Sequence, residues 1–164
     1  TCTNFFFFKN LLEVKNRTRS AISLSAKDKV VVKDLWAKVA PRADEIGFEA
    51  LGRLFEVYPQ TKTYFSHWSD LHPGSAHVKK HGAVIVRKIG EAVAHIDDLT
   101  GALSRGKDQT IYTDLCFVTF NRLLGQTLKV SIALYFPGDF TPEVHVSFDK
   151  FLQNLAIALS EKYR

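Results

Sequence analysis

Hydrophobic residues recur every three or four positions along most of this chain, which is the spacing of one face of an α-helix. The segment 75–96 is the clearest case, because its apolar positions advance by three or four residues and include one imidazole, His81. Similar stripes cover 46–58 and 144–159. Strict alternation of apolar and polar residues, which indicates a half-buried strand, is a competing pattern only near 115–120. The pattern therefore predicts an all-α protein.

Capping residues predict where several of these helices begin. Ser25 precedes Asp28 by three residues, which suits a capping box, and the helix that follows should end near Pro41. Thr141 followed by Pro142 is typical of a helix N-terminus. The connections are short and the stripes are not heptads, so we expect a globular helix assembly and not a coiled coil.

Composition favours one ordinary globular domain. The chain has 164 residues, of which 46% are hydrophobic and 24% are charged. No apolar run approaches the roughly 20 residues that span a bilayer, so no membrane contact is expected. The net charge of +5 is spread along polar faces, and this charge is the only feature that would favour nucleic-acid binding. We therefore expect no nucleic-acid partner.

The first 22 residues differ from the rest of the chain. Four phenylalanines at 5–8 are followed by Lys9 and a basic run at 15–19. A secretory signal would need a longer apolar segment and a convincing cleavage site. We interpret 1–22 as a disordered extension and 23–164 as the folded domain.

Histidine and cysteine spacing gives little support to a metal site. His77 and His81 lie four residues apart on one helix face, which can clamp a metal ion, but no further ligand follows in the usual pattern. A single histidine on an apolar stripe is more often a packed core residue. Cys2 and Cys116 are too few for a disulfide framework, and we expect free thiols. No nucleotide-binding or hydrolase motif occurs, and nothing indicates a catalytic nucleophile with its base.

Three long motifs are specific: Tyr64-Phe65-Ser66-His67-Trp68, Val78-Lys79-Lys80-His81-Gly82, and the run from Phe136 to His145. They resemble the globin family, and within it the α chains of fish haemoglobins, over 23–104 and about 122–164. The resemblance implies a globin fold of six to eight helices, a haem cofactor (iron protoporphyrin IX) and reversible binding and transport of dioxygen. It also implies β-like globin partners in an α2β2 tetramer and a location in the erythrocyte cytosol.

The resemblance implies roles for individual residues as well. His81 matches the histidine on the ligand side of the iron, and Ile85 matches the residue that narrows the ligand pocket. Phe65 matches the ring that stacks on the porphyrin, His67 a side chain that reaches a propionate, and Leu159 a wall residue from the last helix. The implied subunit contacts involve Arg53, Lys62, Thr63, Tyr64, Tyr163 and Arg164.

Residues 105–121 depart from the family although the length is kept. The resemblance implies an axial histidine at position 110, and this chain has Thr110. Haem proteins use His, Cys, Met or Tyr as axial ligands, so a threonine is a poor substitute. Gly106 and several β-branched and aromatic residues predict an irregular segment. We therefore predict weak haem retention and little or no cooperative oxygen binding.

The two atypical segments, 1–22 and 105–121, leave alternatives open. One is a haem-free interaction protein with the globin fold, and the other is a non-functional product of a mispredicted gene. The helix after this segment carries Lys129 at a usually apolar position. We expect the Lys129 ammonium to reach solvent along its own hydrocarbon stem.

Overall fold

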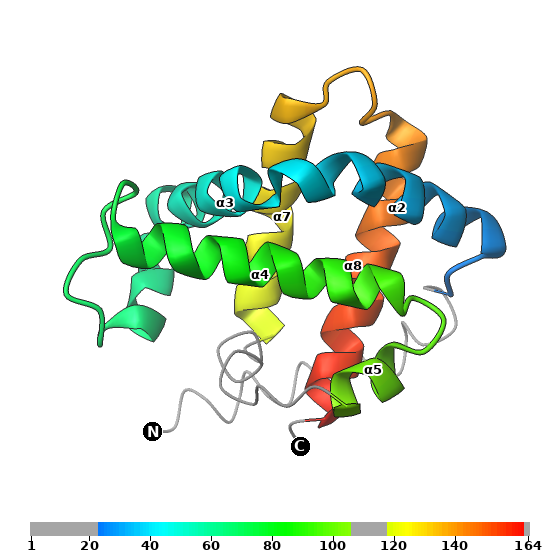
Figure 1. Cartoon of the computed structure of the whole chain (residues 1–164). Coiled ribbons are helices and arrows are strands. Elements are labelled where there is room, and N and C mark those ends of the chain that lie inside the picture. Colours follow the sequence, from blue (N-terminus) through cyan, green and yellow to red (C-terminus); the bar gives the residue numbers. More distant parts are fainter. Residues whose placement is uncertain (1–22, 106–117, 163–164) are drawn as a thin grey trace.

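The computed structural model of this chain describes residues 23–105 and 118–162, without the side chains of 104–105, 118–121 and 160–162. Over these residues the chain forms six α-helices, two short 3₁₀ helices and no strand, which confirms the all-α prediction. In chain order (Figure 1) they are α2 (Ala26–Val39), η1 (Ala40–Arg42), α3 (Ala43–Val57), η2 (Pro59–Phe65), α4 (Ala76–Ala94), α5 (Leu99–Arg105), α7 (Val118–Tyr135) and α8 (Pro142–Lys162).

The predicted capping box at the start of α2 is confirmed. The Ser25 hydroxyl accepts a hydrogen bond from the Asp28 backbone N–H (3.1 Å), and the Asp28 carboxylate accepts one from the Ser25 backbone N–H (3.0 Å). Each bond satisfies a donor that a helix start would otherwise leave unpaired. The α-helix ends at Val39, before Pro41, as predicted.

Asp28 also joins the first described helix to the last. Its carboxylate is buried, and it accepts hydrogen bonds from the Ser147 hydroxyl (2.8 Å) and the Lys150 ammonium (3.0 Å), both on α8. Burial alone would raise the pKa of Asp28, but the hydrogen bonds from Ser25, Ser147 and Lys150 outweigh it and hold this pKa far below its usual range. Asp28 is therefore a charged tertiary contact as well as a helix cap.

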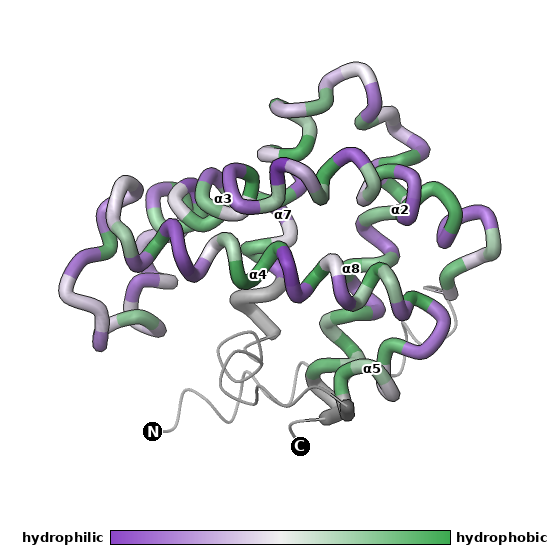
Figure 2. Tube along the Cα trace, viewed as in Figure 1, coloured by the Kyte–Doolittle hydropathy of each residue, from purple (hydrophilic) through white to green (hydrophobic). Residues whose placement is uncertain are grey.

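The helices pack around one hydrophobic core. Helix α4 lies along α3, α3 also contacts α7, and both α2 and α5 pack against α8 (Figure 1). Hydrophobic and hydrophilic residues alternate along the helices, so each contributes one apolar face (Figure 2). None of the helices in the described parts of the chain is long and apolar enough to cross a bilayer.

The sequence predicted an irregular segment, 105–121, that extends too far at both ends. Helix α5 includes Arg105, and α7 already begins at Val118, so the backbone of 118–121 is helical. Packing of α7 against α3 overrides the low helix propensity of the β-branched and aromatic residues there. The rest of this prediction concerns 106–117, which lie outside the described residues, as does the predicted extension 1–22.

The prediction for Lys129 is wrong. Its side chain is 7% exposed, and its ammonium forms an ion pair with the Asp149 carboxylate on α8 instead of reaching solvent. Gln153 donates a second hydrogen bond to Asp149 (2.6 Å). Burial raises the pKa of Asp149, but the hydrogen bond and charge of Lys129 outweigh that effect and lower it. Asp149 follows Lys129 by 20 residues and lies on another helix, so no local pattern indicated the pair.

Candidate functional site

Helix α4, which carries His81, begins where the sequence predicts. The Ser75 hydroxyl accepts a hydrogen bond from the Val78 backbone N–H (3.3 Å) and donates one to the Asp70 carbonyl (3.2 Å). The cap therefore fixes both the first turn of α4 and the loop before it. It also sets the register that turns the apolar stripe of α4 toward the core.

Two glycines bring α4 unusually close to α3. A Cβ placed on Gly47 would lie 2.1 Å from the Gly82 carbonyl oxygen, and one on Gly82 would lie 2.4 Å from the Gly47 carbonyl oxygen. Only residues without a side chain allow the two backbones to touch in this way. Gly82 directly follows His81, so the crossing fixes the backbone that presents this histidine. Sequence reasoning missed the crossing, because neither glycine carries a local signal of its partner.

An aromatic cluster surrounds His81. The His81 ring packs edge-on against Phe65 and Trp68, with ring centroids 5.5 and 5.0 Å apart. Phe65 is almost completely buried, and the Trp68 ring lies 4.6 Å from it. His81 is half-buried, and its Nε2 atom is shielded from solvent. The structure therefore brings together two of the predicted site residues, Phe65 and His81, and adds Trp68, which the sequence did not single out.

His67 and His77 pack on the same indole ring. The His77 ring stacks on Trp68 at 5.8 Å, and the His67 ring meets it edge-on at 5.8 Å. Trp68 thus contacts both His77 and His81, the pair considered for a metal clamp. Nowhere in the described ranges do three or more His, Cys, Asp or Glu side chains gather to hold a metal ion.

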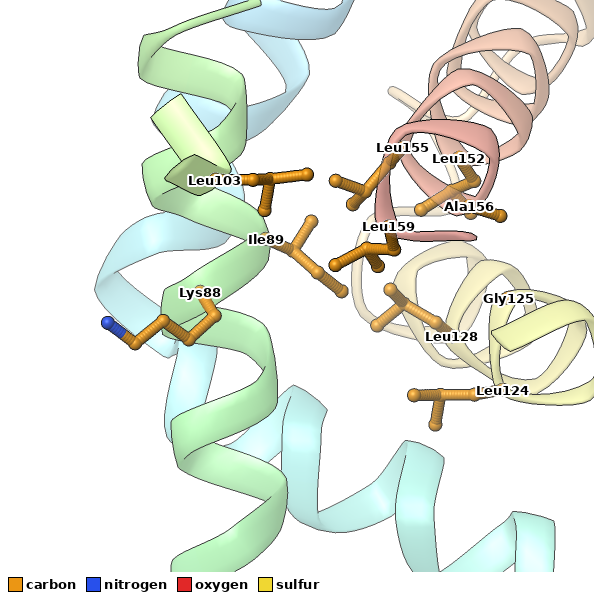
Figure 3. Close-up of a pocket in the computed structure, with 10 residues that line it drawn as sticks. All are labelled: Lys88, Ile89, Leu103, Leu124, Gly125, Leu128, Leu152, Leu155, Ala156 and Leu159. Atoms are coloured by element: carbon orange, nitrogen blue, oxygen red, sulfur yellow. The ribbon is translucent and has the colours of Figure 1, made fainter. Parts of the chain in front are cut away.

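A hollow lies further along the same stripe of α4, between α4, α5, α7 and α8 (Figure 3). Side chains from all four helices point toward its centre, among them Ile89, Leu103, Leu128 and Leu159. The empty space between them is about 480 Å³, including solvent at the open side. The part of it that water-sized molecules can enter is only about 30 Å³, far below the roughly 300–1,000 Å³ of small-molecule sites. The hollow is therefore a small apolar gap that would have to widen to take an organic ligand.

Hydrocarbon dominates the lining of the hollow. The ten described lining residues are Lys88, Ile89, Leu103, Leu124, Gly125, Leu128, Leu152, Leu155, Ala156 and Leu159. Lys88 is the one charged residue among these ten, and its ammonium points away from the hollow (Figure 3). That ammonium donates hydrogen bonds to the Glu91 carboxylate (2.9 and 3.1 Å). The hollow therefore offers apolar contact and no charge.

The predicted site residues do not converge on one hollow. Of Phe65, His81, Ile85 and Leu159, only Leu159 belongs to the described lining of the hollow. His81, Ile85 and Ile89 follow one another at four-residue steps, so they share a face of α4. Ile85 is buried between the aromatic cluster at His81 and the hollow at Ile89. The predicted residues thus divide into an aromatic and imidazole end and a hydrocarbon end, joined by Ile85.

No histidine reaches the hollow. All six histidines of the chain lie in the described segments, and the lining contains none of them. His95 caps α4, where its Nδ1 lies 2.9 Å from the Glu91 carbonyl oxygen, and the His145 ring stacks on Phe140 at 5.4 Å. The lining thus matches the hydrocarbon of a porphyrin in polarity but not in free space, and the described lining supplies no donor for its metal. Three predicted residues lie outside the described residues: Thr110, Tyr163 and Arg164.

The remaining predicted interface residues lie on α3 and η2. The Arg53 guanidinium donates a hydrogen bond to the Glu49 carboxylate, and its Nε is buried without a hydrogen bond in the described structure. Lys62, Thr63 and Tyr64 are exposed on η2. Their exposure is compatible with a contact surface and does not identify the partner.

Exposed apolar side chains add a surface that the sequence pattern did not reveal. Val130 and Leu134, one turn apart on α7, and Val146 on α8 are each about half exposed or more. All three belong to the two helices joined by the Lys129–Asp149 pair. Val146 precedes Asp149 by three residues, which places the two on the same side of α8. Val130, Leu134 and Val146, together called the α7–α8 surface below, are thus each exposed and available for a partner.

Comparison with known proteins identifies the family. Residues 48–159 match the Globin family. The chain is 61% identical over 142 residues to hemoglobin subunit alpha of Carassius auratus, covering 87% of this chain and 100% of that one. It is 57% identical over 143 residues to hemoglobin subunit alpha of Danio rerio and 56% identical to hemoglobin subunit alpha-A of Seriola quinqueradiata, with the same coverage. The chain therefore belongs to the globin family and groups with the α subunits of fish haemoglobins.

Proposed function

We propose that this chain is an oxygen-carrier subunit that holds haem between α4, α5, α7 and α8. The observation that carries the proposal is the apolar face of α4 that runs from His81 through Ile85 to the hollow, in a chain that belongs to the globin family. The hollow would have to widen when haem binds. Haem, when bound, supplies the iron at which dioxygen binds reversibly. The chain is a carrier and not an enzyme.

The described side chains support this function in different ways. His81 is held by Phe65 and Trp68, and its imidazole N–H can donate a hydrogen bond on the ligand side. Ile85 narrows the space one turn later. The buried aliphatic and aromatic groups exclude water, which slows oxidation of ferrous iron. His67 is exposed, as a side chain that meets a propionate at the protein surface must be.

The described residues give little support for tight retention of haem. None of the six histidines lines the hollow, and position 110, where the family resemblance implies the axial histidine, is a threonine. Contacts with hydrocarbon must then hold the porphyrin without a strong axial bond. We expect weak retention of haem and little or no cooperative oxygen binding.

The proposed partners are β-like globin chains in an α2β2 tetramer of the red-cell cytosol. The α7–α8 surface supports a protein partner, because three sizeable apolar side chains gain stability when a second protein covers them. Arg53 and the exposed η2 residues Lys62, Thr63 and Tyr64 are the proposed further contacts.

The test is the absorbance of the purified full-length chain after reconstitution with hemin. Stoichiometric haem that dissociates readily would support the proposal, and His81→Leu should then speed oxidation of the ferrous form. A chain that binds no hemin would overturn it. A stable oxygenated spectrum with tight retention would show that the expected impairment is wrong.

A haem-free interaction protein with the same fold is the second candidate, favoured by the absence of histidine from the hollow's described lining. Anything that binds only the folded state raises its stability. Thermal melting followed by circular dichroism, with and without hemin, separates the two functions. An unchanged melting temperature together with binding of a β chain would favour the haem-free protein.

A further inference from the structure

We propose that His77 is a positioning residue for His81 and that it acts through Trp68. The His77 ring holds the indole of Trp68 in place, and the indole in turn keeps the His81 imidazole inside the aromatic cluster. The inference rests on the proposed function for the role of His81 on the ligand side. It goes further by assigning the surface residue that fixes the orientation of His81.

The Trp68 indole lies at the centre of the aromatic cluster. Its ring centroid is 4.6 Å from that of Phe65, 5.0 Å from that of His81 and 5.8 Å from that of His77. Phe65 is almost completely buried and packs edge-on against Phe55 at 5.2 Å, so its neighbours hold it in place. Trp68 is only half-buried and lies in the bend after η2. Its position against His81 therefore depends on a further contact.

His77 supplies that contact from the exposed surface of α4. Its ring is stacked on the indole with 22° between the planes, whereas His81 meets the indole edge-on at 74°. His77 and His81 are four residues apart, so they share one face of α4 and both reach Trp68. His67 also touches the indole, but it belongs to the same bend and cannot tie the ring to α4. Aromatic pairs gain energy beyond the area they bury, so the His77 stack opposes rotation of Trp68 away from His81.

The backbone around Trp68 is held by bonds that do not act on its ring. The Trp68 N–H donates a hydrogen bond to the Phe65 carbonyl (2.9 Å), and the Ser75 hydroxyl donates one to the Asp70 carbonyl (3.2 Å). Both bonds remain when the His77 side chain is changed. Substitution of His77 should therefore release the indole without unfolding the segment that carries it.

Carbethoxylation of the full-length chain without haem tests the proposal. Diethyl pyrocarbonate, used under single-hit conditions and mapped by mass spectrometry of peptides, reports how accessible each imidazole is. We expect His77→Gln to raise the rate at His81 by about two- to tenfold, the range that corresponds to loss of one aromatic contact. His77→Phe keeps a flat ring on Trp68 and should leave the His81 rate at the wild-type value.

His95 and His145 are internal references, because their contacts lie outside the aromatic cluster. An unchanged His81 rate in His77→Gln would overturn the proposal. An equal rise in His77→Phe would overturn it as well, since the stacked ring would then not be the cause. A parallel rise at all three histidines would show general loosening of the fold and would also count against it.

Acrylamide quenching of tryptophan fluorescence follows Trp68 directly. Trp36 is buried and stacks on Phe148, so it contributes a constant background. Quenching should increase in His77→Gln and not in His77→Phe. Equal quenching in the wild-type chain and His77→Gln would contradict the proposed contact.

Both measurements use the chain without haem, so they decide the positioning role even if the carrier function fails. In the chain reconstituted with hemin, His77→Gln should also speed oxidation of the ferrous form by about two- to tenfold, while His77→Phe should not. Faster carbethoxylation of His81 with an unaltered oxidation rate would end the ligand-side role of His81 and leave its positioning by His77 standing.

Discussion

Helix α4 meets its neighbours in two contrasting ways. Against α3 the backbones touch at Gly47 and Gly82, with no room for a single added carbon atom. Toward α7 and α8 the same helix faces a hollow lined by Ile89 and other aliphatic side chains. Helices in folded proteins otherwise pack without voids. The hollow therefore does not result from loose packing of α4, because the side of α4 that faces α3 is held in close contact.

Truncation of a leucine in each region should give the largest effects. Leu54 on α3 is completely buried and does not line the hollow, whereas Leu128 on α7 is equally buried but lines it. We expect Leu54→Ala to lower the free energy of unfolding by about 4 kcal/mol and Leu128→Ala by about 2 kcal/mol, since a side chain beside empty space has fewer contacts to lose. Urea unfolding measures both. Equal losses would show that the hollow is closed in solution.

Gly47→Ala should disrupt the close backbone contact between α3 and α4. Its new methyl group would lie 2.1 Å from the Gly82 carbonyl oxygen, and a backbone atom cannot move aside as a flexible side chain can. We expect a loss of about 3 kcal/mol in the free energy of unfolding, the upper end for overpacking. A loss below about 1 kcal/mol would mean that α3 and α4 can separate freely.

Lys129→Met tests the wall of the hollow formed by α7 and α8. The change leaves the partly buried Asp149 carboxylate without its counter-charge, and we expect a loss of about 2 kcal/mol at neutral pH, less than for a fully buried pair. The double variant Lys129→Met/Asp149→Asn should recover most of this loss. If the losses in the free energy of unfolding from the two single substitutions simply added in the double variant, the assigned ion pair would be contradicted.

The same pair predicts a pH dependence of stability. Lys129 holds the pKa of Asp149 below its ordinary value in the folded state. The contribution of the pair is therefore fully present above the unfolded pKa of about 4, and it is lost as the pH falls through the folded pKa. Unfolding curves of the wild-type chain and of Lys129→Met should converge on acidification from neutral pH. Curves that stay parallel would contradict the pair's role.

Gly125→Ala makes the same substitution as Gly47→Ala, but on the side of α7 that lines the hollow, and it should have the smallest effect on stability. An added Cβ would meet only the Leu152 Cδ1 atom at 3.4 Å, which is an ordinary contact. The gain from replacing a helical glycine should offset any crowding, so we expect a change within about 0.5 kcal/mol in either direction. A large loss, measured by the same urea unfolding, would show that α7 and α8 are as tightly constrained as α3 and α4.

The sequence predicted the parts of the fold that depend on neighbouring residues. Ser25 and Ser75 cap helices within three residues of themselves, and Pro41 and Pro142 act on their own turns, so these boundaries were predicted correctly. Contacts between distant segments could not be predicted in this way. The crossing at Gly47 and the pair formed by Lys129 depend on helices that the pattern could not place relative to one another.

The candidate site was predictable only as far as the family motif reaches. The motifs around Phe65 and His81 indicated residues that the structure brings into ring contact. The central position of Trp68, against three histidines, was missed because an aromatic residue in a turn has no periodicity to follow. The hollow was anticipated through Leu159 alone, since a cavity depends on what four helices leave unfilled.

The bonds between Asp28 and α8 have a consequence for synthesis of the chain. Asp28 leaves the ribosome long before its tertiary donors Ser147 and Lys150, which follow it by 119 and 122 residues. Until they arrive, the first turn of α2 must keep its carboxylate in water, because burial without those donors is costly. Completion of this part of the fold therefore awaits helix α8, and a premature stop before Ser147 should yield a product that chaperones and proteases recognise as unfinished.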